Sequence, residues 1–243
     1  MREIELGPLT VRLTGGSDRE GGGDGPVVVL LHGFGAPGTD LVGLWRQLSA
    51  PEGTRFAFPE GPLALDIESP FQLGDARAWW PLDVQALEKA LVTGNLDALS
   101  EREPDGMAAA RAQVIEMLDA LEVELGVSGD RVVLGGFSQG AMLSLDVALR
   151  TERPLAGLVQ MSGTLLCKTE WSALMPKRRG LPVLQSHGRQ DPLLPFSLAE
   201  ELRDLMTAAG LDVHFVPFNG EHGISDGVLE ELNAFVMRAL SRP

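Results

Sequence analysis

From residue 27 onward, the hydrophobic positions of this chain alternate between two kinds of segment. Short, nearly continuous apolar runs predict buried strands at Val27–Leu31, 54–58, 131–137, 155–161, 181–186 and 212–218. Apolar residues at every third or fourth position predict amphipathic helices near 40–48, 107–125, 139–150, 196–209 and 227–240. The helix over 107–125 has the clearest period, and Gly126 follows it as a typical helix stop.

Strands that alternate with helices predict an α/β fold with a mostly parallel central sheet flanked by helices on both faces. A hairpin at residues 3–6 and 9–14 is expected before it. The glycine-rich stretch 15–26 is too short for a domain linker and no fixed repeat is visible, so we predict a single domain over 1–243. Residues 60–103 have only weak periodicity and are expected to form a cap-like excursion over the sheet.

The composition narrows the class of protein. The chain has 243 residues, 44% hydrophobic and 22% charged, as in ordinary globular proteins. A formal net charge of −14 disfavours nucleic acids and anionic membranes as partners. The single cysteine excludes an internal disulfide and multi-cysteine metal sites. The first residues are acidic where a signal peptide is basic, and no apolar run approaches the ~20 residues of a membrane span, so a cytoplasmic location is expected.

Ligands of such a sheet bind beyond the carboxyl ends of the strands, so the residues after each strand are the first candidates for chemistry. The strand predicted at 131–137 ends in Gly136-Phe137-Ser138-Gln139-Gly140, a unique Gly-x-Ser-x-Gly in this chain. A sharp strand-to-helix turn with this pattern holds the serine hydroxyl out over the sheet edge. The sequence therefore predicts Ser138 as a nucleophile, and the alternative is a glycine-rich turn with a capping serine.

A serine hydroxyl needs a base, and the base needs an acid that fixes its tautomer. In this architecture the order along the chain is serine, acid, histidine. His222 lies in a loop after the strand at 212–218, whereas His214 lies inside that strand, so His222 is the favoured base. Asp191 follows the strand at 181–186 and is the predicted acid, the alternative being an ordinary Asp-Pro turn.

The loop at residues 33–38 admits two interpretations. It has glycine at its first, third and sixth positions, and Glu60 follows about twenty residues later, which fits the dinucleotide-binding pattern of an NAD-dependent oxidoreductase. In an ester hydrolase the same turn offers the backbone N–H of Phe34 as an oxyanion donor, with that of Gln139 as the second. Ester hydrolysis explains all four loops and the oxidoreductase only one, so we favour the hydrolase.

Five short segments fit one family pattern. They are Leu31-His32-Gly33-Phe34-Gly35, Arg77-Ala78-Trp79-Trp80, Gly135-Gly136-Phe137-Ser138-Gln139-Gly140-Ala141, His187-Gly188-x-x-Asp191 and His222-Gly223-Ile224-Ser225. The Gly-Phe-Ser-Gln-Gly-Ala string is much more specific than the generic serine turn. From Val27 to its C-terminus, the chain resembles the carboxylesterase and phospholipase family of small α/β-hydrolases, which includes acyl-protein thioesterases and bacterial lysophospholipases.

The resemblance implies an α/β-hydrolase fold and a serine carboxylesterase that hydrolyses short- to medium-chain esters through an acyl-enzyme. Ser138, His222 and Asp191 would form the triad, and the amides of Phe34 and Gln139 the oxyanion hole. Lysophospholipase or acyl thioesterase activity on the same triad is the alternative. The resemblance implies neither metal nor organic cofactor. The expected partner is a small-molecule ester, and a homodimer is left open.

The two adjacent tryptophans, Trp79 and Trp80, are the candidates for the substrate pocket. Successive side chains of an extended segment point to opposite sides, so one indole is expected to line the pocket with Phe34 while the other packs in the structure. The family pattern favours Trp79 as the pocket residue. Ala36 and Pro81 stand where the family usually carries acidic residues, which leaves the physiological substrate open.

Overall fold

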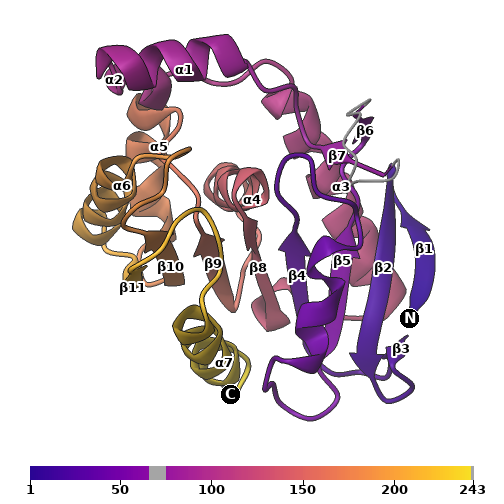
Figure 1. Ribbon diagram of the computed structural model, residues 1–243. Helices are drawn as coiled ribbons and strands as arrows, with labels where there is room; N and C mark the ends of the chain where they lie inside the picture. The colour runs from indigo at the N-terminus through magenta and orange to yellow at the C-terminus, as the bar shows by residue number, and fades with distance from the viewer. Residues whose placement is uncertain (66–74, 242–243) are drawn as a thin grey trace.

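The computed structural model describes residues 1–65 and 75–241 of the chain. Among these residues, a nine-stranded sheet forms the centre of the molecule (Figure 1). Its strands are β1 (Arg2–Leu6), β2 (Leu9–Gly16), β3 (Glu20–Gly22), β4 (Val27–Leu31), β5 (Arg55–Pro59), β8 (Val132–Phe137), β9 (Gly157–Met161), β10 (Pro182–Gly188) and β11 (Asp212–Phe218). Their order is β1-β2-β5-β4-β8-β9-β10-β11, with β3 beside β2, while β6 (Leu63–Ala64) and β7 (Arg77–Ala78) form a separate hairpin.

The sheet is parallel from β5 to β11, whereas β2 pairs antiparallel with β1 and β5 and parallel with β3. The predicted mostly parallel sheet is therefore confirmed. Strand β4 shows why its sequence is a continuous apolar run. Val27, Val29 and Leu31 pack into the core on one face, and Val28 and Leu30 into the core on the other. A strand covered on both faces has no solvent side to mark with polar residues.

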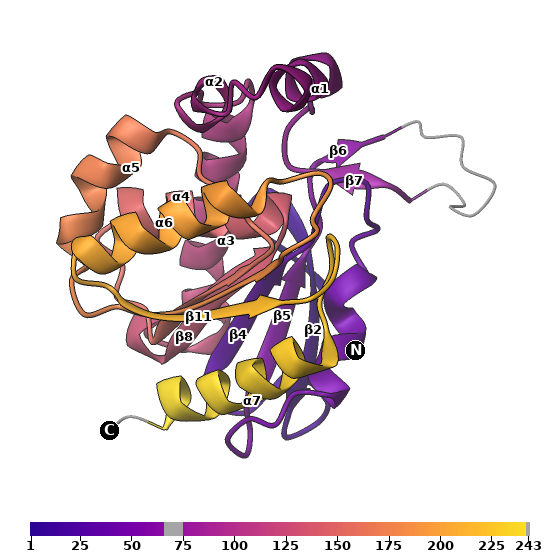
Figure 2. The same cartoon turned by 60° about the vertical axis from the view of Figure 1, so that its left-hand side comes forward.

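Helices cover both faces of the sheet, as predicted. Figure 2 shows α3, α4, α5 and α6 on one face and α7 on the other. The bounds are α3 (Met107–Leu125), α4 (Gln139–Arg150), α5 (Lys168–Leu174), α6 (Phe196–Ala208) and α7 (Asp226–Leu240), with 3-10 helices η1 (Asp40–Arg46), η2 (Gly129–Arg131) and η3 (Met175–Arg178). Helix α3 ends at Gly126 as expected. The helix expected near 40–48 is the 3-10 helix η1, and α5 is an addition to the sequence prediction.

The segment expected as an excursion, residues 60–103, carries more regular structure than its weak periodicity indicates. It contains β6, β7 and two helices, α1 (Val84–Thr93) and α2 (Asp97–Ser100). These helices lie above the carboxyl ends of the strands in Figure 1. Residues 66–74 of the excursion lie outside the described residues.

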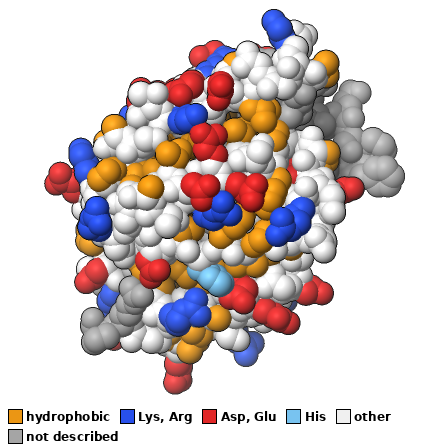
Figure 3. Space-filling view, turned by 90° about the vertical axis from the view of Figure 1, so that its left-hand side faces the viewer, with side chains coloured by type: hydrophobic (Ala, Val, Ile, Leu, Met, Phe, Trp, Pro, Cys, Tyr) orange, Lys and Arg blue, Asp and Glu red, His pale blue; other side chains and the backbone are white. Residues whose placement is uncertain are grey.

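The surface mixes charges of both signs. Figure 3 views the side that carries α6 and β11, where acidic and basic side chains are interspersed and apolar ones lie between them in the upper and middle part. On this face, the excess of acidic groups is thus spread out and forms no single patch. Among the helices described, none combines the length and the apolar character that crossing a membrane requires.

Candidate active site

Ser138 lies at the turn between β8 and α4. Its backbone has φ 53° and ψ −117°, a strained conformation for a residue with a side chain. A Cβ atom on Gly136 or on Gly140 would run into the carbonyl group of Leu31, so only glycine lets β4 pass this closely. The Ser138 N–H donates to the Met161 carbonyl at 2.8 Å. The Gly-x-Ser-x-Gly pattern thus produces the strained turn that the sequence predicted.

Three side chains from separate loops form a hydrogen-bonded line. His222 Nδ1 lies 2.6 Å from Asp191 Oδ2, and His222 Nε2 lies 2.9 Å from Ser138 Oγ. A carboxylate can only accept, so Nδ1 carries the proton, and Nε2 is left to accept from the Ser138 hydroxyl. His222 comes from the loop between β11 and α7, and Asp191 from the loop after β10. The structure therefore brings together the three residues predicted as nucleophile, base and acid.

The Asp191 carboxylate is surrounded by donors. Its Oδ1 accepts from the backbone N–H groups of Leu193 and Leu194, both at 2.9 Å, and its Oδ2 has His187 Nε2 at 3.2 Å besides His222. Burial by itself would raise the pKa of Asp191, but the hydrogen bonds from His187, His222 and Leu194 outweigh it and hold the pKa below its ordinary value. Asp191 is thus kept as a carboxylate facing the imidazole.

The two predicted oxyanion donors flank Ser138. Phe34 and Gln139 both line the cavity at the serine, and no turn or loop hydrogen bond within the described residues uses the N–H of either. Gln139 opens α4, so its N–H lies at the positive end of the helix dipole. Its buried side chain accepts a hydrogen bond from the backbone N–H of Trp79 and donates one to the backbone carbonyl of Trp80, both at 2.9 Å. Gln139 thereby joins the serine turn to the tryptophan segment.

Trp80, and not Trp79, lines the cavities. Both indoles are buried, with 1% of Trp79 and 2% of Trp80 exposed. The Trp79 Nε1–H donates to the His32 carbonyl at 2.9 Å and its ring packs on the His32 ring, so it stabilises the turn behind the site. The preference for Trp79 is therefore wrong. Residues 79 and 80 form a bend after β7, so the side-to-side alternation of an extended strand does not apply.

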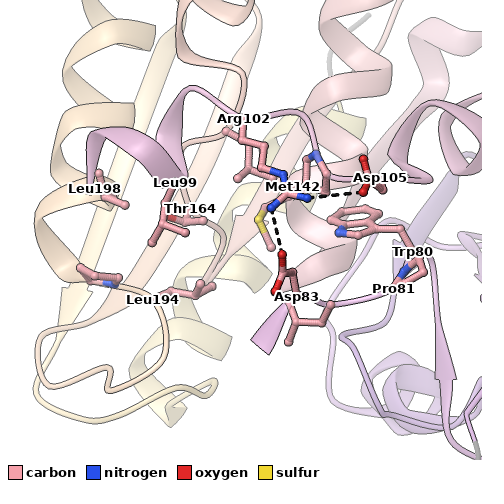
Figure 4. A pocket seen from close by; sticks show the side chains of 14 residues that line it. Trp80, Pro81, Asp83, Leu99, Arg102, Asp105, Met142, Thr164, Leu194 and Leu198 are labelled. Carbon is pink, nitrogen blue, oxygen red and sulfur yellow. Dashed lines mark hydrogen bonds and ion pairs between the residues drawn. The ribbon is translucent and has the colours of Figure 1, made fainter. Parts of the chain in front are cut away.

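A cavity at Ser138 adjoins a second cavity. The site cavity, of about 210 Å³, contains Ser138, His222, Phe34 and Gln139 in its lining. The second cavity, of about 360 Å³, is mostly apolar and is drawn in Figure 4. The residues shared by the two linings are Trp80, Leu82, Met142 and Leu194. The second cavity, called the side cavity below, therefore adjoins the site cavity at these four residues.

Charged groups lie at one part of the side cavity. Arg102 pairs with Asp83 at 3.1 Å and with Asp105 at 3.4 Å, and Figure 4 shows both interactions beside Trp80 and Met142. Leu99, Leu194 and Leu198 supply apolar surface elsewhere in the lining (Figure 4). An apolar chain that fills the cavity would thus meet charge where it reaches Arg102.

The loop at 33–38 is built as part of this site. Gly35 N–H donates to the Arg77 carbonyl at 2.8 Å, and Arg77 N–H donates to the Ala36 carbonyl at 3.0 Å. Glu60, the candidate ribose-binding acid, pairs with Arg12 and Arg77. The loop leads into the 3-10 helix η1, whose first turn has no regular α-helical N-terminus for a pyrophosphate. These residues do not support the oxidoreductase alternative.

The remaining histidines and the cysteine have structural surroundings. His32 is buried; its Nε2 accepts from Gly61 N–H and its Nδ1 donates to the Gly33 carbonyl. His214 pairs with Glu231 at 2.8 Å on the outer strand β11, away from Ser138. Burial raises the pKa of the Cys167 thiol to about 12, which makes it a poor nucleophile. In the described part of the chain, no cluster of His, Cys, Asp or Glu could hold a metal ion.

Sequence reasoning missed several residues of the site. Met142, Leu82 and Leu194 line the cavities, and His187 is a second partner of Asp191. Met142 could have been found, because position 142 lies one turn after Ser138 on the predicted helix. Leu82 and Leu194 lie in irregular loops, where no periodicity shows which way a side chain points.

Comparison with known proteins shows the family of this chain. The model of a family described as Phospholipase/Carboxylesterase matches residues 21–240. The chain belongs to this family. Its members are α/β-hydrolases, so the predicted fold and the resemblance seen in the sequence are both confirmed.

The proteins to which this chain is similar include an esterase and acyl-protein thioesterases. The chain is 29% identical over 214 residues to Acyl-protein thioesterase 1 of Neurospora crassa, an alignment that covers 85% of this chain and 82% of the relative. It is 26% identical to Acyl-protein thioesterase 1 of Schizosaccharomyces pombe, with 89% and 92% covered. The crystal structure of esterase PE8 superposes with a TM-score of 0.72 at 27% identity, with 93% of this chain and 98% of that chain covered.

Proposed function

We propose that this protein is a serine carboxylesterase that hydrolyses short- to medium-chain carboxylic esters. The observation that carries the proposal is the line from Asp191 through His222 to Ser138, at 2.6 Å and 2.9 Å. Hydrogen bonds of this length in this order are what activation of a serine hydroxyl requires. The apolar side cavity beside Ser138 offers a site for the acyl chain.

In the proposed mechanism Ser138 attacks the ester carbonyl while His222 Nε2 takes the hydroxyl proton. Asp191 keeps the imidazole in the productive tautomer and stabilises its charged form. The amides of Phe34 and Gln139 hold the negative oxygen of the tetrahedral intermediate. His222 then protonates the leaving alcohol, and a water molecule activated by the same histidine hydrolyses the acyl-enzyme. Every step is assigned to residues of this chain.

The expected chain length follows from the lining of the side cavity. Trp80, Met142 and Leu194 favour an apolar acyl group near the serine, because burying each methylene group stabilises the complex by about 0.8 kcal/mol. Arg102 and its two carboxylate partners oppose a longer acyl chain, because these charged groups would have to lose contact with water. Short to medium chains gain the apolar contacts without reaching the charges.

Acyl thioester hydrolysis is the second candidate, and lysophospholipid hydrolysis the third. Thioester hydrolysis is favoured by the names of the relatives, which are acyl-protein thioesterases in Neurospora crassa and Schizosaccharomyces pombe. Both alternatives use the same triad and differ only in the leaving group and the acyl chain.

The test is a series of p-nitrophenyl esters of increasing acyl length, with thioesters and lysophospholipids of the same acyl groups beside them. We expect kcat/KM to be highest for short- to medium-chain esters, and Ser138→Ala to remove essentially all hydrolysis while the protein stays folded. A preference for the thioester beyond its greater intrinsic reactivity would replace the first candidate by the second. Retention of more than a few per cent of activity in Ser138→Ala would contradict all three.

A further inference from the structure

Ser162 follows the last residue of β9 and lies beneath the loops of the triad. Its φ is 50°, in the left-handed region that residues with side chains avoid, and its side chain is fully buried. Its Oγ donates to the Gly223 carbonyl at 3.0 Å. Gly223 directly follows His222, so this bond ties the chain on the C-terminal side of the base. Strain of this kind persists where the surrounding contacts demand it, and it often marks a functional region.

The other side of the base has an anchor of its own. The Gln190 N–H donates to the Gly220 carbonyl at 2.9 Å, and Gln190 directly precedes Asp191. The loop that carries the acid therefore holds the chain before His222. Ser162 holds the chain after His222. Of these two anchors, the one from Ser162 is made by a side chain, its hydroxyl group.

The end of β9 also reaches the two other loops of the triad. The Met161 carbonyl accepts from Ser138 N–H at 2.8 Å. The Ser162 N–H donates to the Ser186 carbonyl at 2.9 Å, near the end of β10, the strand that leads to Asp191. Two successive residues thus contact the nucleophile, the strand before the acid and the loop of the base. The left-handed turn lets Ser162 serve β10 with its N–H and the His222 loop with its hydroxyl.

We propose that Ser162 is a positioning residue that keeps His222 Nε2 in line with Ser138 Oγ, an inference that rests on the proposed function. Ser162 lines neither of the two cavities at the serine, so it acts through Gly223 and leaves substrate binding alone. Without its hydroxyl the loop after His222 loses its side-chain anchor. Proton transfer then slows because the imidazole spends less time in line with the serine, whereas the acyl cavity keeps its shape. The loss falls on kcat and not on KM.

Ser162→Gly is the variant that tests this most sharply, because glycine adopts the same backbone without strain and only the hydroxymethyl group is lost. Cys167→Gly is the matched control. Cys167 is also buried and left-handed, with φ 45°, and lines neither cavity. We expect Ser162→Gly to lower kcat about 10- to 100-fold with KM nearly unchanged, and Cys167→Gly to keep the wild-type kcat. Ser162→Ala should lose kcat in the same way and serves as the second variant.

The rate at which a fluorophosphonate labels Ser138 gives a readout that needs no substrate, and it is expected to slow in Ser162→Gly by a factor similar to that for kcat. A wild-type kcat in Ser162→Gly, an equal loss in Cys167→Gly, or a loss confined to KM would overturn the role of Ser162. If the wild type is labelled but hydrolyses no ester or thioester, the proposed function fails, and the labelling rates still decide the role of Ser162. If the wild type is not labelled, both proposals fail.

Discussion

The two sides of the candidate site are built in different ways. The side with Ser138, His222 and Asp191 consists of loops at the ends of strands. Hydrogen bonds to neighbouring strands and loops hold these loops in place. The opposite side comes from residues 80–105, where Arg102 is 44% and Asp83 52% exposed in their ion pair. Such exposed pairs stabilise a structure by only about 0–1 kcal/mol. We therefore expect catalysis to depend on closely fixed atoms, and the choice of substrate to depend on residues 80–105, called the wall below, where changes are tolerated more easily.

The two sides meet at Gln139. Its backbone N–H faces the chemistry as a proposed oxyanion donor, while its side chain holds the backbone of Trp79 and Trp80. A change in the triad should therefore affect turnover most strongly. A change in the wall should affect stability or the preferred chain length, and a change in the Gln139 side chain should affect the connection between them.

The largest effect is expected from removing the base. His222→Asn should lower kcat by a factor on the order of 10⁵ to 10⁶, as loss of the base does in a well-studied serine protease. His214→Asn is the matched control, because His214 lies on the outer strand β11 and pairs with Glu231 of α7, and its turnover should equal that of the wild type. Steady-state hydrolysis of a p-nitrophenyl ester measures both. If His214→Asn were inactive and His222→Asn active, His214 and not His222 would be the base.

Asp191→Asn should lower kcat by about 10⁴, because an amide stabilises the wrong tautomer of the histidine. The same ester assay measures this loss. The position of the imidazole should not change, so KM should stay close to that of the wild type. A variant with more than a tenth of the wild-type turnover would contradict the role of the carboxylate.

The pH dependence of stability gives Asp191 a second test. Its pKa is lower in the folded protein than the ordinary value of about 3.9, so its charge stabilises the fold above that pH. This stabilisation is lost as the pH falls below about 4 towards the folded pKa. Urea unfolding at several pH values should therefore show a smaller loss of stability below pH 4 in Asp191→Asn than in the wild type. Equal slopes would mean that the carboxylate gains nothing from its donors.

Gln139→Leu tests the connection between the two sides. It keeps the backbone N–H but leaves the Trp79 N–H and the Trp80 carbonyl buried without partners, at a cost of about 2–4 kcal/mol in unfolding free energy. Gln47→Leu, at an exposed position, should change stability by less than about 0.5 kcal/mol. Urea unfolding of both variants measures the difference. If Gln139→Leu were as stable as Gln47→Leu, the side chain would not hold the tryptophan segment.

The tryptophan pair separates the wall from the support behind it. Trp80→Ala removes a side chain shared by both cavities, so the preferred acyl chain should become longer. Trp79→Ala should lower the unfolding free energy by about 3–5 kcal/mol and leave the preferred length unchanged. Relative kcat/KM across the ester series measures the first effect, and urea unfolding the second. A shift in chain length with Trp79→Ala alone would reverse the assignment.

The sequence was most informative where chemistry and backbone geometry coincide. Ser138, Asp191 and His222 each follow a predicted strand, and a parallel sheet brings those positions to one edge, so their meeting could be expected. Helices α1 and α2 could not be predicted in the same way. Alternation also failed for Trp79 and Trp80, because the chain bends at these two residues.

The contacts that fix the site were the least visible in the sequence. Ser162 reaches Gly223 across 61 positions, and Gln139 reaches Trp79 across 60. Such pairs have no spacing rule, because they depend on which loops the fold brings together. His187 was noted only as part of a motif, and its approach to Asp191 follows from the turn between them. From a single sequence the candidate reacting groups can thus be predicted more readily than the residues that hold them in place.

The most direct test of Ser138 as an activated nucleophile is to incubate the protein with a fluorophosphonate and measure its intact mass. We expect one covalent adduct per chain, located at Ser138 by peptide mapping, because only this serine has a histidine base held by an acid within the described residues. The adduct should be absent from Ser138→Ala and form far more slowly in His222→Asn. A wild-type protein that stays unlabelled, or an adduct that persists in Ser138→Ala, would show that Ser138 is not the activated nucleophile.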